Sequence, residues 1–341
     1  MCAMPRPWRI RYAGAKYHVT VRGNAREVIF HAAEDYARFL AQLQAALELD
    51  GVVLYAYVLM PNHAHLVVET PLGNISRFMQ RLNTAYGMYR RYKRRRPGHC
   101  FQSRYGATLV SGDEYALRVT RYVHLNPVKV KALQGASPAE RIAHLNRYPW
   151  SSYRAYVGKA APDVPVEPRG LSLLGRGTRK AQRLAYRAYV ESLVDGEDPV
   201  LKEARLASRY AIGDERFRAR IDGEVQEARL RKGVYGGDIV WPVGRRPALA
   251  AVLGLVAAEF GLPVTALKAH GKGVGVAKPI AAELCARYCG VSQRAVGHAL
   301  GCPGNGAVGK QRLRLRRKLA DDSRLARRIE RIRDKLTSMI V

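Results

Sequence analysis

The chain has few cysteines, few acidic residues and no long apolar run. Its five cysteines are odd in number and scattered (Cys2, Cys100, Cys285, Cys289 and Cys302), which is typical of a protein of the reducing cytoplasm rather than of a disulfide framework. No apolar stretch approaches the roughly 18 residues of a membrane-spanning helix, and the N-terminus lacks the apolar segment of a secretory signal. We therefore expect a cytoplasmic protein without a membrane partner.

The shortage of acidic residues is the main compositional signal. The 341 residues contain 58 Lys and Arg against 28 Asp and Glu, so the formal net charge is +30. Such an excess suits a polyanionic partner, nucleic acid above all. Hydrophobic residues make up 48% of the chain, which is enough for two or three domains with ordinary cores.

Roughly the first 135 residues alternate strand and helix patterns. Alternating apolar residues predict strands, and apolar residues spaced by three and four predict helices. The elements in chain order are a strand at 17–22, a helix at 31–51, strands at 52–60 and 63–70, a helix from Asn74 or Ser76 to Pro97, a strand at 106–112 and a helix at 113–126. This order predicts an α+β fold, with a small antiparallel sheet and helices on one face. We expect the last helix to end at Asn126, because the residue before a proline disfavours helical backbone.

The rest of the chain is predicted to be mainly helical. Residues 158–245 begin with a proline-rich loop and continue with helical stretches at 179–194, 199–209 and 214–230, as expected of a connector. From 246 onward, KPIAAELCARYCGVSQRAVGHALG has the outline of a helix-turn-helix, with Ser292 as the cap of its second helix. The sequence thus predicts three parts: 1–157, 158–245 and 246–341.

Two histidines stand at the start of a predicted strand in MPNHAHLVVE, residues 60–69. The side-chain period of a strand is two, so His63 and His65 point to the same face and could bind one metal ion or one phosphate. Two neutral imidazoles leave a divalent ion with open positions, as polarisation of a phosphodiester oxygen requires. The alternative is an ordinary strand face with one buried, hydrogen-bonded histidine.

A strand-cleavage reaction also needs a nucleophile, and YALRVTRYVHLNP offers one. Tyr122 and Asn126 are four residues apart on one helix face, so a phenol and an amide oxygen project together. Asn126 could be a third metal ligand beside the histidines, and a cation would favour the Tyr122 phenolate. The alternatives are that Tyr122 packs in the core, that Asn126 caps the helix end, or that Tyr115 is the nucleophile.

A basic run lies between these parts, at RLNTAYGMYRRYKRRRPGHCFQSR (81–104), with eight Lys or Arg and no acidic residue. Basic side chains interleaved with tyrosines can hold a nucleic-acid backbone by charge and stack bases on rings. A solvated charged face is the alternative, but the run contains no counter-charge. We expect DNA contacts from Arg90, Arg91, Lys93, Arg94, Arg95 and Arg104.

Residues 5–157 resemble the REP-associated tyrosine transposases, a branch of the single-tyrosine HUH nucleases. The resemblance is carried by YHVTVRGN, YAYVLMPNHAHLVVETP, GHCFQSRYGATLV, RYVHLNPVKV and YPWSSYRAYVG in that order. It implies a ferredoxin-like palm, His63, His65 and Asn126 as ligands of Mg²⁺ or Mn²⁺, and Tyr122 as nucleophile. It also implies a single-stranded DNA hairpin as substrate and a covalent 5′-phosphotyrosine. The sequence departs from the family at Ala64, which is small, and at Gly106, where a basic residue is common.

Residues 246–341 resemble the DNA-binding domain of the replication initiator DnaA. VAAEFGLPVTALKA and KPIAAELCARYCGVSQRAVGHALG carry this resemblance, which fails at CPGNGAVGKQRLR, where the reading helix of that family is expected. It implies duplex DNA binding through phosphates, to which Lys310 and Arg312 would contribute, without the target sequence of the initiator.

The sequence therefore predicts a nucleoid-associated, metal-dependent nuclease and strand transferase of single-stranded DNA that acts at palindromic repeat hairpins. The alternatives are a catalytically weak or inactive DNA-binding regulator on the same fold, and an RNA-binding protein that uses the basic helix. Whether the chain forms a homodimer, with Tyr122 acting across it, stays open.

Overall fold

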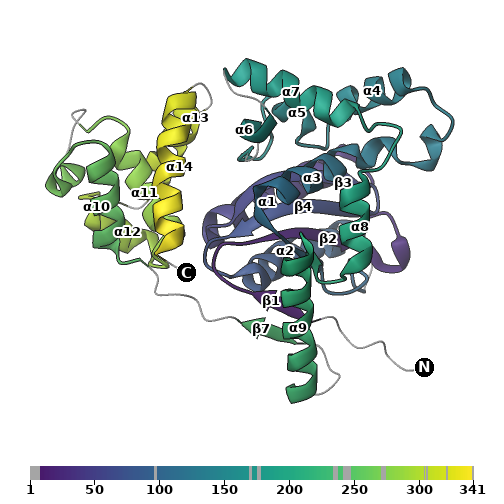
Figure 1. Cartoon of the computed structure of the whole chain (residues 1–341), viewed down its shortest axis with the longest axis horizontal. Helices are drawn as coiled ribbons and strands as arrows, with labels where there is room; N and C mark the ends of the chain where they lie inside the picture. The colour runs from purple at the N-terminus through teal and green to yellow at the C-terminus, as the bar shows by residue number, and fades with distance from the viewer. Residues whose placement is uncertain are drawn as a thin grey trace. The chain divides into compact units, whose positions relative to one another are not determined.

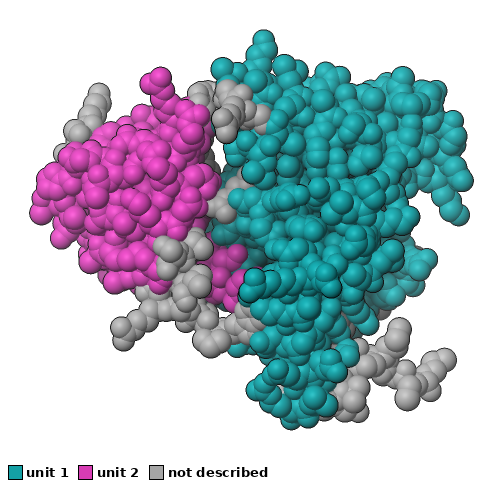
Figure 2. Space-filling model, viewed as in Figure 1, with its two compact units in different colours: residues 1–11, 15–70, 74–241 teal, residues 12–14, 71–73, 242–341 magenta. Residues whose placement is uncertain are grey.

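The computed structural model describes residues 8–95, 98–168, 171–174, 178–232, 237–240, 247–269, 274–302, 304, 306–319 and 322–339. The chain divides into two compact units (Figure 2), the first with residues 1–11, 15–70 and 74–241 and the second with residues 12–14, 71–73 and 242–341. The predicted connector is thus counted mainly with the first unit, and the boundaries of the three predicted parts stay a prediction.

A five-stranded sheet lies at the centre of the first unit (Figure 1). Its order is β3-β4-β2-β5-β6, and all neighbours are antiparallel except β5 and β6, which are parallel. The strands are β2 (Ala15–Arg22), β3 (Val53–Met60), β4 (His63–Thr70), β5 (Gly106–Val110) and β6 (Ala211–Ile212). The predicted antiparallel pair 52–60 and 63–70 is confirmed, whereas β6 comes from the predicted connector and was not predicted.

Three helices separate these strands along the chain, and the predicted α+β class is confirmed. They are α1 (Ala33–Asp50), α2 (Ile75–Arg94) and α3 (Gly112–Leu125). Helix α1 ends at Gly51, as predicted, because this residue has a left-handed backbone with φ of 66° that favours glycine.

Helices cover both faces of the sheet, which corrects the predicted single helical face. Val58 and Val67 pack in one cluster with residues of α3 and α8 (Pro199–Ala207). Leu59 and Leu66, which point to the other face, are fully buried too, and α1 contacts β3 without contributing to that cluster. Strands buried on both faces carry near-continuous apolar runs, so their sequence does not show how many faces are covered.

The end of α3 differs from the prediction in its physical reason. Regular helix stops at Leu125, but Asn126 keeps a helical backbone with φ of −53° and ψ of −40°. The chain continues into the 3-10 turn η2 (Asn126–Val128), with Pro127 in its first positions, where a missing N–H costs little. Pro127 therefore allows the helix to continue as a tighter 3-10 turn, and it does not force Asn126 out of the helical backbone conformation.

Helix α3 is fixed from a second side by the buried His124. Its Nδ1 lies 2.6 Å from the Tyr186 hydroxyl and its Nε2 lies 2.7 Å from Ser152 Oγ. These contacts tie α3 to helix α7 (Arg179–Glu191) and to the segment before α5 (Tyr153–Tyr156). Because buried hydrogen bonds fix orientation as well as position, the side chains on the opposite face of α3 are held in place.

The remaining elements of the first unit are short or lie late in the chain. The predicted helices at 179–194, 199–209 and 214–230 are confirmed as α7, α8 and α9. The other elements are β1 (Arg9–Arg11) and β7 (Asp238–Val240), which pair in parallel, η1 (Asn24–Arg26), η3 (Lys131–Leu133), α4 (Pro138–Arg147), α6 (Leu171–Leu174) and α9 (Glu215–Lys232).

The described residues of the second unit are helical after residue 246. The elements are α10 (Leu249–Glu259), η4 (Val264–Lys268), α11 (Ala277–Tyr288), α12 (Gln293–Ala299), α13 (Ala307–Leu319) and α14 (Ser323–Ser338), which share one apolar core. The predicted cap is confirmed, because Ser292 Oγ accepts a hydrogen bond of 3.2 Å from Ala295 N. The likeness of this unit to the initiator domain stays a prediction.

Candidate active site

The predicted histidine pair lies on one face at the start of β4. The ring centroids of His63 and His65 are 5.0 Å apart and the rings are nearly perpendicular, at 89°. His65 is buried and His63 is half-buried. The period-two prediction is thus confirmed in its geometry: one strand brings two imidazoles together where it begins.

A third histidine, His18, completes the group and was missed by the sequence analysis. It comes from β2, the neighbour of β4, and its ring stacks on His65 with centroids 5.0 Å apart and planes at 19°. His18 Nε2 lies 2.9 Å from His65 Nδ1, and Thr20 Oγ1 lies 3.2 Å from the same nitrogen. The alternation in YHVTVR places His18 and Thr20 on one strand face, which was the available signal.

Burial keeps these histidines neutral. It lowers the pKa of His18 to about 3, with a smaller effect from the charge of Arg205. It lowers the pKa of His63 to about 4, helped by Arg22, and that of His65 well below its usual range. Neutral imidazole is the form that binds a metal ion or accepts a hydrogen bond, so the group is ready for either at neutral pH.

The predicted nucleophile, Tyr122, lies against this group. Its ring is edge-on to His18, with centroids 5.6 Å apart, and to His65, with centroids 5.9 Å apart. Tyr115 packs on the same apolar cluster, but within the described residues no ring contact joins it to a histidine. The structure therefore brings Tyr122, and not its rival, to the histidines; its role as nucleophile stays a prediction.

The amide nitrogen of Asn126 is engaged at the end of its own helix. It donates to the backbone oxygens of Tyr122 at 2.9 Å and Val123 at 3.4 Å, so it satisfies the end of that helix. No group of three or more His, Cys, Asp or Glu suited to a metal occurs in the described ranges. The alternative of a helix-capping asparagine thus describes this conformation, and ligation by Asn126 Oδ1 stays a prediction.

The two histidines nevertheless fit a divalent ion. Nδ1 of His65 is engaged by His18 and Thr20, and Nδ1 of His63 lies 2.7 Å from Asn62 Oδ1. This leaves Nε2 of each ring as the nitrogen for a ligand. Metal-binding histidines usually have their second nitrogen fixed in this way, which sets the tautomer and the ring orientation.

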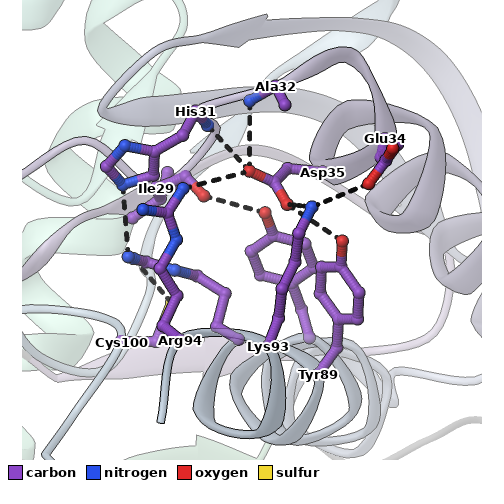
Figure 3. A network of polar contacts seen from close by, with 11 residues as sticks. Ile29, His31, Ala32, Glu34, Asp35, Tyr89, Lys93, Arg94 and Cys100 are labelled. Carbon is purple, nitrogen blue, oxygen red and sulfur yellow. Dashed lines mark hydrogen bonds and ion pairs between the residues drawn. The ribbon is translucent and has the colours of Figure 1, made fainter. Parts of the chain in front are cut away.

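The basic end of α2 is less open than its sequence indicates. Lys93 Nζ lies 3.0 Å from Glu34 Oε2 and 2.8 Å from Asp35 Oδ1, and Arg94 Nη2 lies 3.8 Å from Asp35 Oδ2 (Figure 3). Tyr89 also donates to Asp35, at 2.9 Å. Counter-charge is therefore present, on α1, and the inference from its absence within the run was wrong for Lys93 and Arg94.

Asp35 is the centre of this network. It is 2% exposed, and burial alone would raise its pKa; hydrogen bonds from Lys93, Tyr89 and the backbone N–H groups of His31 and Ala32 nevertheless lower that pKa. Its carboxylate thus accepts from the two residues that precede α1 and from α2 at once. We infer that part of the basic run holds these two helices together.

The other predicted DNA contacts of the first unit differ in exposure. Arg91, Arg95 and Arg104 are exposed. Arg90 is half-buried, with Nη1 at 3.7 Å from Cys100 Sγ and Nη2 at 3.4 Å from His31 Nε2. Three of these six predicted residues therefore have an exposed guanidinium for which no ion pair is found among the described residues.

In the second unit, the two predicted contacts also separate. Lys310 is exposed on α13. Arg312 is 4% exposed, and its Nε lies 2.6 Å from Glu283 Oε2 in a buried ion pair. The prediction that Arg312 meets DNA is wrong for this conformation, because the side chain turns into the core of the unit.

Residues 11–126 match a model of a transposase family, a class of DNA-processing enzymes. The family is described as "Transposase IS200 like". The match spans 116 of the 341 residues, about one third of the chain, and runs from just before β2 to the end of α3. It therefore contains His18, His63, His65, Tyr122 and Asn126.

Among solved structures, the chain is similar to one described as "Structure of the REP associates tyrosine transposase bound to a REP hairpin". The identity is 17%, the match covers 52% of this chain and 99% of that chain, and the TM-score is 0.36. No curated protein matches the chain. None of the helices in the described ranges is both long and apolar enough to cross a membrane.

Proposed function

We propose that the chain is a metal-dependent endonuclease and strand transferase of single-stranded DNA, which acts at palindromic repeat hairpins through a 5′-phosphotyrosine at Tyr122. One observation supports this most: the Tyr122 ring contacts the buried imidazoles of His18 and His65 inside the segment that matches a transposase family. The hairpin substrate rests on the sequence resemblance of residues 5–157.

In the proposed cleavage, the phenolic oxygen of Tyr122 attacks a phosphorus atom of the DNA backbone. The bond from phosphorus to the 3′ oxygen breaks, the phenol loses its proton, and the 3′ oxygen gains one to leave as a hydroxyl. Attack by another 3′-hydroxyl on the phosphotyrosine reverses these changes and joins the strands. One phosphodiester replaces another at each step, so no external energy source is needed.

His63 and His65 would hold the Mg²⁺ or Mn²⁺ ion, with Asn126 as the third ligand that the family resemblance implies. When bound, such an ion polarises a phosphodiester oxygen and favours a nearby phenolate. His18 and Thr20 hold the His65 ring in orientation through its Nδ1. The chain would thus supply a neutral pair of ligands whose ring orientation is fixed by their other hydrogen bonds.

The DNA strand would meet the first unit along the exposed part of the basic run. Arg91, Arg95 and Arg104 are exposed there, and Tyr92 presents 78% of its surface to solvent. Charged contacts to phosphates and stacking on a ring bind single strands with little dependence on sequence. We infer that duplex DNA flanking the hairpin binds the second unit, where Lys310 is exposed.

The test is incubation with Mn²⁺ and a labelled library of single-stranded hairpins, followed by denaturing gels that detect protein bound to a 5′ end. Wild type and Tyr115→Phe should form the adduct, and Tyr122→Phe should not. An adduct lost only in Tyr115→Phe would contradict the assignment of the nucleophile.

A second candidate is a DNA-binding regulator with the same fold and little catalysis. The position of Asn126 favours it, because this side chain serves its own helix end. Tight hairpin binding without an adduct in either metal would support the regulator. In both cases we expect the protein to act at the nucleoid. Whether a homodimer shares its active sites can be tested by mixing Tyr122→Phe and His65→Ala chains. Cleavage by the mixture is expected only if the tyrosine of one chain acts with the histidines of the other.

A further inference from the structure

Helix α8, which lies outside the segment that matches the transposase family, is anchored on the helix of Tyr122. Asp198 caps α8 by accepting from Val200 N at 3.1 Å and Leu201 N at 3.2 Å. The same carboxylate lies 3.1 Å from Arg118 Nη1 and pairs with Arg121, both on α3. Asp198 is 8% exposed. One buried carboxylate therefore fixes the beginning of α8 against α3.

Two helical turns later, α8 presents Arg205 to Tyr122. Seven residues bring a side chain back to nearly the same helix face, so Arg205 faces α3 as Asp198 does. The Arg205 Cζ atom lies 4.4 Å from the centroid of the Tyr122 ring, within the range of a cation–π contact. The guanidinium is also near enough to the imidazoles to lower the pKa of His18 and of His65, although burial contributes more to both shifts.

A pocket of about 270 Å³ opens beside this contact. Its lining includes Tyr122 and the cationic side chains Arg118, Arg121, Lys129, Lys202 and Arg205, against the acidic Glu197 and Asp198.

Three of the five cationic side chains in the lining already have a carboxylate partner. Asp198 takes Arg118 and Arg121, and Lys202 Nζ lies 3.0 Å from Glu197 Oε2. Within the described residues, Arg205 forms no ion pair of its own. The pocket therefore has an unneutralised guanidinium placed directly at the tyrosine.

We propose that Arg205 is a catalytic residue that binds the phosphate attacked by Tyr122, and that the pocket beside it receives the adjoining sugar-phosphate backbone. This inference rests on the proposed function. Arg205 would donate to a non-bridging oxygen and stabilise the charge that builds up as the phenolic oxygen bonds to phosphorus and the 3′ oxygen leaves. A single α8 side chain would thus complete a site whose other groups all lie within residues 11–126.

Binding is tested first, in the Tyr122→Phe background, which keeps the ring under the guanidinium and prevents cleavage. The probe is a labelled single-stranded hairpin, titrated over a range of salt concentrations without divalent metal. Arg205→Ala and Arg205→Gln should weaken binding about tenfold and reduce the slope of log affinity against log salt by about 0.7, as expected for one lost phosphate contact. Arg205→Lys should keep the slope, because it keeps the charge.

Adduct formation is tested next, with Mn²⁺ and otherwise wild-type protein. Arg205→Ala should slow it about 100-fold at saturating DNA, and Arg205→Lys should recover part of the rate. Arg209→Ala is the matched control, because Arg209 is exposed just after α8 and does not line the pocket.

The outcomes separate the two proposals. An unchanged salt slope in Arg205→Ala, or a rate equal to that of Arg209→Ala, would overturn the phosphate contact while the proposed function stands. If wild type forms no adduct with Mn²⁺, the proposed function fails. The binding measurements then decide on Arg205 alone: a reduced salt slope in Arg205→Ala supports its phosphate contact, and an unchanged slope overturns it.

Discussion

The tyrosine site and the basic end of α2 show opposite effects of tertiary structure. At Tyr122, folding adds groups that lie far away in the sequence: His18 from β2 and Arg205 from α8 both contact its ring. At the end of α2, folding takes groups away, because Asp35 of α1 pairs with Lys93 and Arg94. Folding can therefore add distant side chains to a site, while it can also pair cations of a basic run that would otherwise be available to DNA.

This difference follows from the chemistry of the two surfaces. Neutral imidazole and phenol rings lose little on burial and can collect partners inside the protein. Cationic side chains are costly to bury alone, so they pair with any carboxylate that the fold brings near. A charged run in a sequence therefore shows only the upper limit of the charge that is offered to DNA.

Acid should break the tyrosine site most strongly. Burial lowers the pKa of His18 to about 3, of His63 to about 4 and of His124 to about 3. Below pH 6.5 these histidines take up protons in the unfolded chain but stay neutral in the folded chain. The free energy of unfolding therefore falls as the pH drops from about 6.5 toward 4, by several kcal/mol in total. Denaturant titrations at pH 7.0, 5.5 and 4.5 check this; constant stability over that range would contradict the buried, neutral histidines.

Removal of a predicted ligand should have the next largest effect. His65→Ala and His63→Ala should each weaken Mn²⁺ binding by more than about 100-fold, because this exceeds the usual cost of losing only a supporting group. Calorimetric titration with Mn²⁺ measures it. His144→Ala is the control, since this histidine lies on α4, and equal affinity in all three variants would contradict the site.

Loss of the Asp35 charge should destabilise the fold and release cations. Asp35→Asn should cost about 3 kcal/mol of unfolding free energy, because it breaks a buried charge network, yet it should strengthen single-stranded DNA binding by freeing Lys93 and Arg94. Glu34→Gln is the matched control: its side chain is 81% exposed, so its effect on stability should be near zero. Weaker DNA binding in Asp35→Asn would show that the network itself builds the interface.

His18→Ala should weaken Mn²⁺ binding about 10- to 100-fold by freeing the His65 ring. His18→Gln, which keeps a polar group near His65 Nδ1, should restore part of this affinity. Circular dichroism shows whether the variants fold. Equal Mn²⁺ affinity in wild type and His18→Ala would mean that His18 only packs.

The smallest expected effect is a difference in the salt dependence of DNA binding between variants of two neighbouring cations of α2. Arg91→Ala should reduce the slope of log affinity against log salt by about 0.7, whereas Lys93→Ala should change it little, because Lys93 is already paired with Glu34 and Asp35. Equal slopes for the two variants would remove the distinction between free and occupied cations.

Much of the first unit could be predicted from local patterns. Period-two alternation indicated β2 and β4, and Gly51 marked the end of α1. The spacing of His63 and His65 within one strand indicated correctly that these two side chains share a face. These features depend on residues fewer than about eight positions apart, where the geometry of one element is decisive.

The rest depends on contacts between distant segments. The two-residue strand β6 joins the sheet across about a hundred residues and has no pattern of its own. The alternation in YHVTVR indicated the strand face of His18, but not which residues it meets. The contacts of His18 with His65, of Arg205 with Tyr122 and of Lys93 with α1 join different elements, and neither periodicity nor composition encodes such contacts. The buried Arg312 shows the same limit, because a charged residue in a basic run gave no sign of its partner Glu283.

The most direct test is to find which residue carries the DNA. Wild-type protein would be reacted with a hairpin and Mn²⁺, digested with trypsin and nuclease, and analysed by mass spectrometry. We predict a nucleotide linked through its 5′ phosphate to Tyr122, in the peptide YVHLNPVK that follows Arg121. The same group on the peptide that ends at Arg118, which contains Tyr115, would contradict the site described here.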